Sequence, residues 1–234
     1  MRIRIILSNP TVEVPVDNQH YMNGFINAIL GEGNKYHDKF SDYAISSLQG
    51  GKLNKGKKTL SFPREPYFYV STLNGQFMAD FLRGTTMNKA TMFGMYISKV
   101  DMLADFRLNK YYDDMLTISP ILLTNKSGWK LTFKKNPEWL ALLKRNCIDK
   151  LRHAGIGDDT FNIEIINSDK AKEKTVWVGN VFNPASQIKL RVYGKPETRN
   201  AIYSLGFGKC TGSGFGSVDY YNNPYRLFEQ HSES

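Results

Sequence analysis

The sequence predicts an α+β protein built from two ferredoxin-like halves, each an antiparallel sheet with helices on one face. In the first hundred residues, the apolar spacing indicates strand, helix, strand, strand, helix and strand in that order. This is the order of the ferredoxin-like split unit. A similar order follows after an extended segment, residues 116–121, in which Pro120 disfavours helix. We therefore expect one domain over residues 1–115 and a second over residues 116–234.

The elements of the first half are marked by apolar spacing and by capping or turn residues. Residues 3–7 are mostly apolar and β-branched, which is typical of a buried strand. Asp17 or Asn18 can cap a helix that ends near Leu30, before a glycine-containing turn. Residues 50–58 contain four lysines and three glycines and indicate a basic loop or hairpin tip. The remaining expected elements are strands over 43–48, 67–72 and 92–100 and a helix over 76–82.

The second half repeats this order without a close sequence repeat, so the duplication is inferred from the element order alone. Pro137 suits the first turn of a long helix that we expect to end at His153. A second helix is expected over residues 196–205. Strands are expected over 128–133, 161–166, 187–194 and 215–220.

The bulk composition indicates a basic protein with no feature of a membrane or secreted protein. The 234 residues include 31 Lys+Arg and 22 Asp+Glu, and the resulting formal charge of +9 favours polyanionic partners. Cys147 and Cys210 form no CxxC pair, which argues against a zinc site and makes a reducing cytoplasm the expected location. No apolar run approaches the ~20 residues of a membrane span. No acidic cluster has metal-ligand spacing, and we expect Asp113 and Asp114 to form a turn or a solvated pair.

The most informative motif is a glycine-rich segment, residues 206–216, with five glycines among eleven residues. It lies between an expected helix and an expected strand, which is the reverse of the dinucleotide fingerprint. No Lys-Ser/Thr pair closes its second glycine cluster, so the P-loop pattern is also absent. Such a loop can place successive N–H groups against phosphates or against a helix. A glycine-rich hairpin tip without a ligand is the alternative.

Four segments together resemble the CRISPR-associated repeat-processing endoribonucleases, the sixth Cas family within the repeat-associated (RAMP) superfamily. They are residues 15–22 at the start of the first helix, Tyr36-His37-Asp38 followed by residues 43–51, residues 117–121, and residues 206–216. The second is similar to the family's His-acid pair before a short strand, and the fourth to its C-terminal glycine-rich signature. The resemblance implies tandem ferredoxin-like domains and cleavage of CRISPR repeat RNA without a metal or other cofactor. It further implies that a 2′-hydroxyl attacks the adjacent phosphate, leaving a 2′,3′-cyclic phosphate and a 5′-hydroxyl.

This reaction needs a group that takes the 2′-hydroxyl proton, a group that protonates the leaving oxygen, and positive charge at the phosphate. Histidine suits proton transfer near neutral pH. By the resemblance, His37 occupies the place of the catalytic histidine. Some relatives use a tyrosine in the first helix, but Ile26 and Asn27 stand at the matching positions here. The candidate helpers, in order of preference, are Lys52, Lys39, Tyr36 and Tyr21.

Basic residues of the second half are the main candidates for RNA binding, since phosphate contacts supply much of the affinity for nucleic acid. Lys189 and Arg191 alternate with apolar residues along one expected strand. The other candidates surround or form the glycine-rich segment: Lys195, Arg199, Lys209, Gly206, Gly208, Gly212, Gly214 and Gly216. A second basic cluster comprises Lys52, Lys55, Lys57 and Lys58. The expected partners are precursor and mature CRISPR repeat RNA, with an effector complex as a further candidate, for a monomer or homodimer without membrane contact.

Two other functions fit parts of the sequence. A non-catalytic RNA-binding subunit of the same superfamily would use the glycine-rich segment to hold guide RNA and would not need a histidine at position 37. A structural scaffold would use the basic charge to contact other proteins and would show no affinity for RNA. An RNA-binding and cleavage assay separates all three.

Overall fold

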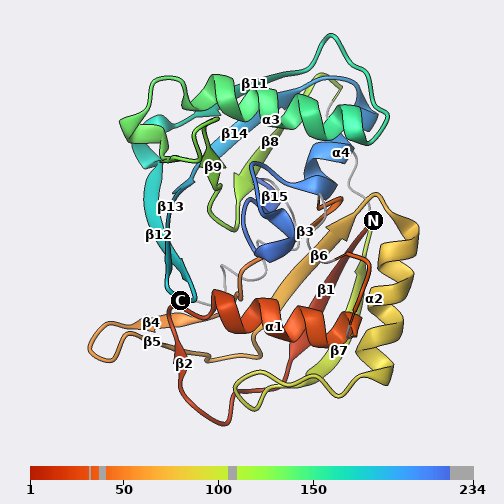
Figure 1. Cartoon of the computed structure of the whole chain (residues 1–234), viewed down its shortest axis with the longest axis vertical. Helices are drawn as coiled ribbons and strands as arrows, with labels where there is room; N and C mark the ends of the chain where they lie inside the picture. Colours follow the sequence, from red (N-terminus) through yellow and green to blue (C-terminus); the bar gives the residue numbers. More distant parts are fainter. Residues whose placement is uncertain (32, 37–40, 105–109, 222–234) are drawn as a thin grey trace.

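The computed structural model describes residues 1–31, 33–36, 41–104 and 110–221, and it contains two four-stranded antiparallel sheets (Figure 1). The first sheet has the order β3-β6-β1-β7, with β1 (Arg2–Leu7), β3 (Tyr43–Ile45), β6 (Tyr67–Thr72) and β7 (Ile97–Leu103). The second has the order β11-β14-β8-β15, with β8 (Tyr112–Thr117), β11 (Asn162–Ile166), β14 (Lys189–Tyr193) and β15 (Val218–Tyr220). Numbered within its own half, each sheet runs 2-3-1-4.

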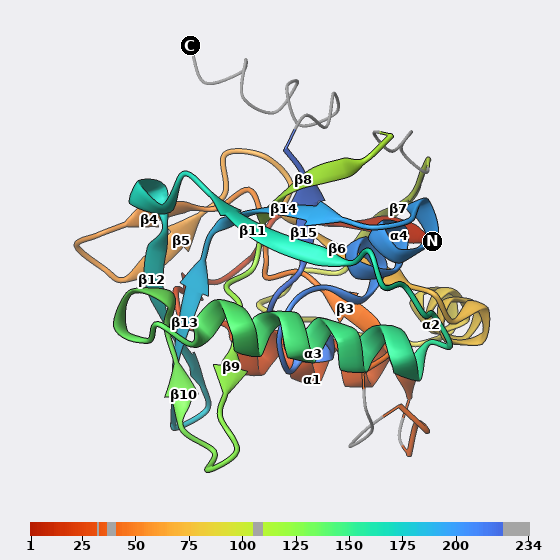
Figure 2. The same ribbon diagram turned by 90° about the horizontal axis from the view of Figure 1, so that it is seen from above.

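Two helices accompany each sheet, which completes the ferredoxin-like order in both halves. They are α1 (Gln19–Leu30) and α2 (Gly75–Met87) in the first half, and α3 (Trp139–His153) and α4 (Pro196–Leu205) in the second. The predicted fold class is therefore confirmed. Figure 2 shows α1 and α3 on the same side of the molecule, below the sheets in that view.

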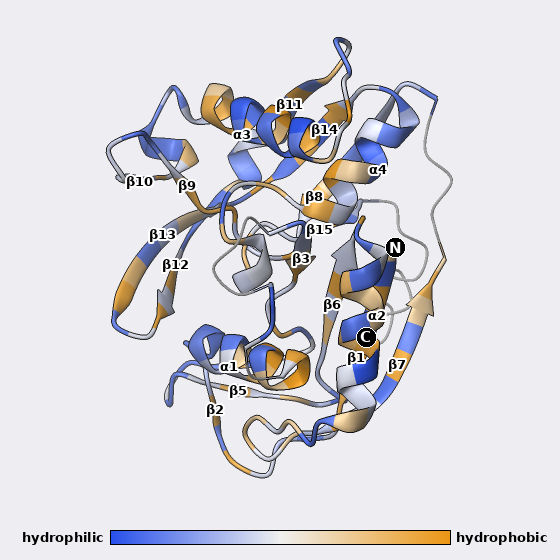
Figure 3. Cartoon of the chain, turned by 45° about the vertical axis from the view of Figure 1, so that its right-hand side comes forward, coloured by the Kyte–Doolittle hydropathy of each residue, from blue (hydrophilic) through white to orange (hydrophobic). Residues whose placement is uncertain are grey.

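Each half has its own hydrophobic core, formed where the helices cover one sheet face. In α1, the apolar residues Met22, Phe25, Ile26 and Ile29 keep helical spacing and are buried. In β14, Leu190 and Val192 are fully buried, whereas the alternating Lys189, Arg191 and Tyr193 are only partly buried on the other face. The hydropathy colouring in Figure 3 shows this mixed character along the helices and strands.

Short hairpins extend from the two units. The lysine-rich residues 50–58 lie in a hairpin, as predicted, formed by β4 (Lys52–Asn54) and β5 (Thr59–Ser61) beside β2 (Val14–Pro15). The second half adds two hairpins that the apolar pattern did not predict as such, β9 (Leu123–Thr124) with β10 (Lys130–Leu131), and β12 (Lys172–Val178) with β13 (Val181–Gln187). Three short 3₁₀ segments complete the fold: η1 (Phe133–Lys135), η2 (Ser168–Lys170) and η3 (Thr211–Ser213).

Several predicted boundaries differ from the structure. The strand expected over residues 92–100 begins only at Ile97, because Phe93 and Gly94 adopt positive φ in a turn that pairs Met92 with Met95. The strand expected over residues 128–133 is reduced to β10. Strand β8 crosses the expected domain boundary and pairs with β14 and β15, so the second sheet already includes Tyr112. No helix in the described ranges is long and apolar enough to cross a membrane.

Candidate functional site

A cavity of about 470 Å³ lies where elements of the two halves meet. The loop between α4 and β15, residues 206–217, forms one wall and is called the glycine loop below. In Figure 1 this loop, drawn in blue, lies between α1 and α3. The residues that line the cavity are Asn23, Ile26, Asn27, Tyr36, Ser41, Tyr43, Asn146, Lys150, Gly208, Lys209, Cys210, Thr211, Gly212 and Ser213.

The glycine loop is held by close contacts with the first half. Gln19 Nε2 at the start of α1 donates to the Ser213 carbonyl at 2.7 Å, and Thr211 Oγ1 donates to the Tyr43 carbonyl at 2.9 Å. A Cβ atom at Gly212 would lie 2.7 Å from the Tyr43 ring. The loop therefore packs against α1 and β3 through side-chain contacts, and the use predicted for its N–H groups stays a prediction.

Glycine is required in this loop because the backbone turns sharply and approaches other backbone closely. Gly206, Gly208, Gly214 and Gly216 all have positive φ, between 60° and 85°. A Cβ atom at Gly206 would lie 2.7 Å from the Gly216 carbonyl oxygen, so the two ends of the loop meet only without side chains.

The same loop leaves backbone donors at the cavity. Most of its N–H groups bond within the chain, for example Lys209 N to the Leu122 carbonyl at 2.8 Å. The N–H groups of Gly208, Cys210, Thr211 and Gly212 make no hydrogen bond to any described residue. Backbone N–H groups of this kind can bind an anion such as a phosphate oxygen.

Helix α3 brings a buried lysine to the opposite wall. Lys150 is 3% exposed, and its Nζ donates to the carbonyls of Leu205 and Gly206 at 3.1 and 3.0 Å. Burial lowers the pKa of Lys150 to about 8. No Asp or Glu occurs among the described residues that line the cavity, so this ammonium faces no carboxylate there.

Sequence reasoning missed Lys150, although the pattern of its helix carries a signal for it. Leu143, Cys147 and Leu151 form the apolar stripe of α3 and are buried. Lys150 follows Leu143 by seven residues and Cys147 by three, which places it on this apolar stripe rather than on the solvated face. Asn146, Asn23 and Gln19 were also missed, and nothing in their spacing distinguishes them from surface amides.

Comparison with known proteins shows similarity to one family. Residues 107–220 match the family described as CRISPR associated protein Cas6, C-terminal. The CRISPR-associated endoribonuclease Cas6 1 of Methanocaldococcus jannaschii is 25% identical over 93% of this chain and 92% of its own length. The CRISPR-associated endoribonuclease Cas6 of Pyrococcus furiosus is 25% identical over 90% of this chain and 85% of its own length. The chain is similar to the Cas6 family.

The solved structures agree with the Cas6 fold. A structure described as an RAMP protein binding different RNA substrates has a TM-score of 0.79 and 19% identity, covering 95% of this chain and all of its own. Another, described as CRISPR associated protein Cas6, has a TM-score of 0.74 and 22% identity, with 95% and 99% coverage. The family resemblance inferred from the four sequence segments is thus confirmed.

The predicted catalytic histidine lies outside the described residues. His37 and Lys39 both fall within residues 37–40, for which the structure gives no placement. The described residues that flank this segment, Tyr36 and Ser41, both line the cavity. The assignment of His37 as the catalytic histidine stays a prediction.

The structure gives both tyrosines contacts within the fold, and their choice as catalytic helpers stays a prediction. The Tyr36 hydroxyl donates to Asp80 at 2.7 Å on α2, and burial followed by this bond raises the pKa of Tyr36. Its hydroxyl is therefore used within the fold. Tyr21 is exposed and its ring packs 4.9 Å from the ring of Phe93, whereas the cavity side of α1 carries Asn23, Ile26 and Asn27.

Lys52 lies apart from the cavity lining. It is the exposed first residue of β4, in the hairpin that also carries the other lysines of the second basic cluster. Within that hairpin, Lys57 forms an ion pair with Glu13 at 2.8 Å. The hairpin remains a candidate for phosphate contacts, but the structure provides no link between Lys52 and the cavity.

The basic strand β14 faces away from the cavity. Arg191 bonds Asp114 through Nε and a terminal nitrogen at 2.7 and 3.2 Å and lies 4.0 Å from the centre of the Tyr112 ring. Lys189 Nζ lies 3.6 Å from Asp114 and 3.2 Å from the centre of the Tyr221 ring. These side chains form a cationic and aromatic surface on the uncovered face of the second sheet, on the side opposite to α3.

Arg199 is buried, pairs with Asp113 and does not line the cavity, which argues against its prediction as an RNA-binding residue. Its side chain is fully buried, and one terminal nitrogen bonds the buried Asp113 at 2.7 Å. Asp113 and Asp114 lie on β8 and bind arginines on its two sides, so the prediction of a turn or a solvated pair is wrong. Lys195 and Lys209 are exposed, and only Lys209 lines the cavity.

No described set of three or more His, Cys, Asp or Glu side chains is grouped so that it could hold a metal ion. Cys147 is buried and Cys210 is exposed, and each is a free thiol.

Proposed function

We propose that this chain is a metal-independent endoribonuclease that cleaves CRISPR precursor RNA within its repeats to produce guide RNAs. The relatives matched over most of the chain are named CRISPR-associated endoribonucleases. The observation that carries the proposal is the cavity between α1, α3 and the glycine loop. Its lining contains two lysines and backbone N–H groups without a described hydrogen-bond partner, and no described Asp or Glu. Such a lining favours a negatively charged phosphodiester.

In the proposed reaction, the ribose 2′-oxygen attacks the adjacent phosphorus, and the bond from phosphorus to the 5′-oxygen breaks. The 2′-hydroxyl loses its proton, and the leaving 5′-oxygen gains one. His37 is the proposed proton-transfer group, because it directly follows Tyr36 at the cavity rim and histidine titrates near neutral pH. Lys209 and the glycine-loop N–H groups would stabilise the charge that develops on the phosphate oxygens.

The decisive test is cleavage of the repeat RNA from the chain's own genome in the presence of EDTA. We expect full cleavage, with products that end in a cyclic phosphate, or its hydrolysed 3′-phosphate, and a 5′-hydroxyl. A requirement for Mg²⁺ together with 5′-phosphate products would refute the mechanism. RNA that is bound but stays intact would instead support the non-catalytic RNA-binding subunit.

The role of His37 is tested by substitution. His37→Ala should lower the single-turnover rate by about 10²-fold or more and leave RNA affinity nearly unchanged. His20→Ala is the matched control, because His20 is exposed at the start of α1 and does not line the cavity. Normal cleavage by the His37 variant, with loss in the His20 variant, would transfer the role to His20.

A further inference from the structure

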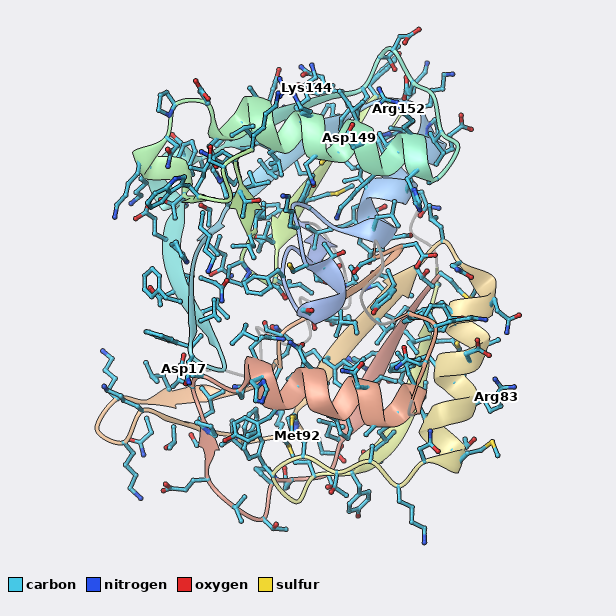
Figure 4. All side chains as sticks on the ribbon, in the orientation of Figure 1. Asp17, Arg83, Met92, Lys144, Asp149 and Arg152 are labelled. Carbon is cyan, nitrogen blue, oxygen red and sulfur yellow. The ribbon has the colours of Figure 1, made fainter. Side chains whose placement is uncertain are left out.

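Helix α3 presents two polar side chains to the cavity, one helical turn apart. Asn146 and Lys150 both line it, and residues four apart lie on the same helix face. The outer face of the helix is different, since Asp149 and Arg152 are exposed there and pair with each other at 3.2 Å (Figure 4). The polar residues on the cavity side are therefore separate from the solvated surface of α3.

Neither of the two side chains is fully satisfied by the protein. Asn146 Oδ1 is buried and has no hydrogen-bond partner among the described residues. An ammonium has three N–H donors, and Lys150 makes two hydrogen bonds to described residues, both to carbonyls at the C-terminal end of α4. The negative end of the α4 dipole favours a cation there, but a buried charge without a counter-ion is unfavourable. A bound anion would supply the missing charge.

We propose that Asn146 and Lys150 form a nucleotide subsite of the RNA-binding cavity. Lys150 Nζ donates its remaining N–H to a backbone phosphate, and Asn146 Oδ1 accepts a hydrogen bond from the ribose 2′-hydroxyl of the same nucleotide. This rests on the proposed function, in that RNA is the substrate. RNA carries a 2′-hydroxyl donor next to its phosphate, and DNA lacks this group.

A purely structural role for Lys150 explains fewer of the observations. Capping of α4 accounts for its two bonds to carbonyls, but it leaves Asn146 unpaired in the same wall. The titratable groups that face Lys150 are Cys147 on its own helix and Cys210, Lys209 and Tyr43 across the cavity. None of these groups is a carboxylate, so no described residue neutralises the ammonium, whereas a bound anion would.

Binding measurements with three variants test the subsite. Each substitution is placed in the His37→Ala background so that the RNA stays intact, and dissociation constants are measured in EDTA for the repeat RNA and for DNA of the same sequence. Lys150→Met should weaken binding of both by about 10- to 100-fold, the worth of a charge-assisted hydrogen bond. Asn146→Ala should weaken binding of RNA by about 5- to 10-fold and leave DNA unchanged. Lys144 lies on the same helix but does not line the cavity, and it bonds Asn162 of β11 at 2.9 Å. Lys144→Met should therefore change the affinity for RNA and for DNA by no more than about twofold.

Two results would overturn the proposal: equal losses in the Lys150 and Lys144 variants, or equal losses for RNA and DNA in the Asn146 variant. Asn146→Ala removes no bond from the buried Oδ1, so it tests the subsite even if the Lys150 variant fails to fold by circular dichroism. Cleavage is measured separately in the unsubstituted chain. If that chain binds RNA without cutting it while the variants behave as expected, the subsite stands and the proposed function fails.

Discussion

Gly214 joins the glycine loop to α1, and Gly214→Ala tests whether this contact is what requires glycine. Gly214 has φ +85°, and an added Cβ would overlap the side-chain amide of Gln19. That amide donates to the Ser213 carbonyl at 2.7 Å. The substitution therefore combines backbone strain with displacement of a side chain that holds the two halves together.

The expected loss in the free energy of unfolding has two parts. A non-glycine residue in the left-handed region costs about 1–2 kcal/mol, and loss of the bond from Gln19 adds about 1 kcal/mol. The sum, about 2–3 kcal/mol, corresponds to a fall in Tm of about 5–10 °C for a chain of this size. Gly155→Ala is the matched control, because Gly155 has φ +74° but its Cβ would meet nothing within 4 Å. Gly155→Ala should therefore show only the loss from backbone strain, a fall in Tm of about 2–6 °C.

Thermal unfolding of both variants, followed by circular dichroism, measures the difference. Equal losses would refute the reasoning, since the contact with Gln19 would then contribute nothing. The double variant Gln19→Ala with Gly214→Ala should lose less than the sum of the two single variants, because the residues share one contact. Gly214→Ala should also weaken RNA binding, since it displaces a wall of the cavity, whereas Gly155→Ala should not.

Three further predictions concern charged residues. Asp113→Ala leaves the buried Arg199 without its counter-charge and should reduce the free energy of unfolding by about 3–5 kcal/mol in denaturant titrations; a loss below about 1 kcal/mol would contradict it. Because burial lowers the pKa of Lys150 from 10.5 to about 8, the unfolded chain binds a proton that the folded chain lacks between these values. The unsubstituted chain should therefore gain stability relative to Lys150→Met as the pH rises above 8, by about 1.4 kcal/mol per pH unit, and a constant difference in Tm would argue against the shift. Lys189→Ala with Arg191→Ala should lower RNA affinity and reduce the salt slope by about 0.7 per lost contact. It should spare the single-turnover rate at saturating RNA, because β14 faces away from the cavity; unchanged binding would place the RNA path elsewhere, with the β4–β5 hairpin as the next surface to test.

The sequence alone predicted the order of the ferredoxin-like elements and the resemblance to the Cas6 endoribonucleases. Apolar spacing depends on neighbours a few residues apart, so it located β1, β6, α1 and α4 well. The strands that were misplaced are short or interrupted, as at Phe93 and Gly94, where a turn replaces the expected pairing. The glycine-rich segment was also recognisable from the sequence, because five glycines in eleven residues indicate a backbone that approaches other atoms closely.

What only the tertiary structure decided is which of the polar residues meet. Lys150 and Arg199 have the same charge as the lysines of the β4–β5 hairpin. The apolar stripe of α3 indicates that Lys150 is buried, but it does not indicate which residues Lys150 or Arg199 contacts. The fold buries Arg199 against Asp113, places Lys150 in the cavity, and turns Lys189 and Arg191 to the opposite face. Burial and pairing arise from contacts between residues that are far apart in the chain, such as the 86 positions between Asp113 and Arg199. Local periodicity carries no information on such contacts, which is why the sequence could predict the elements around the cavity but not the side chains inside it.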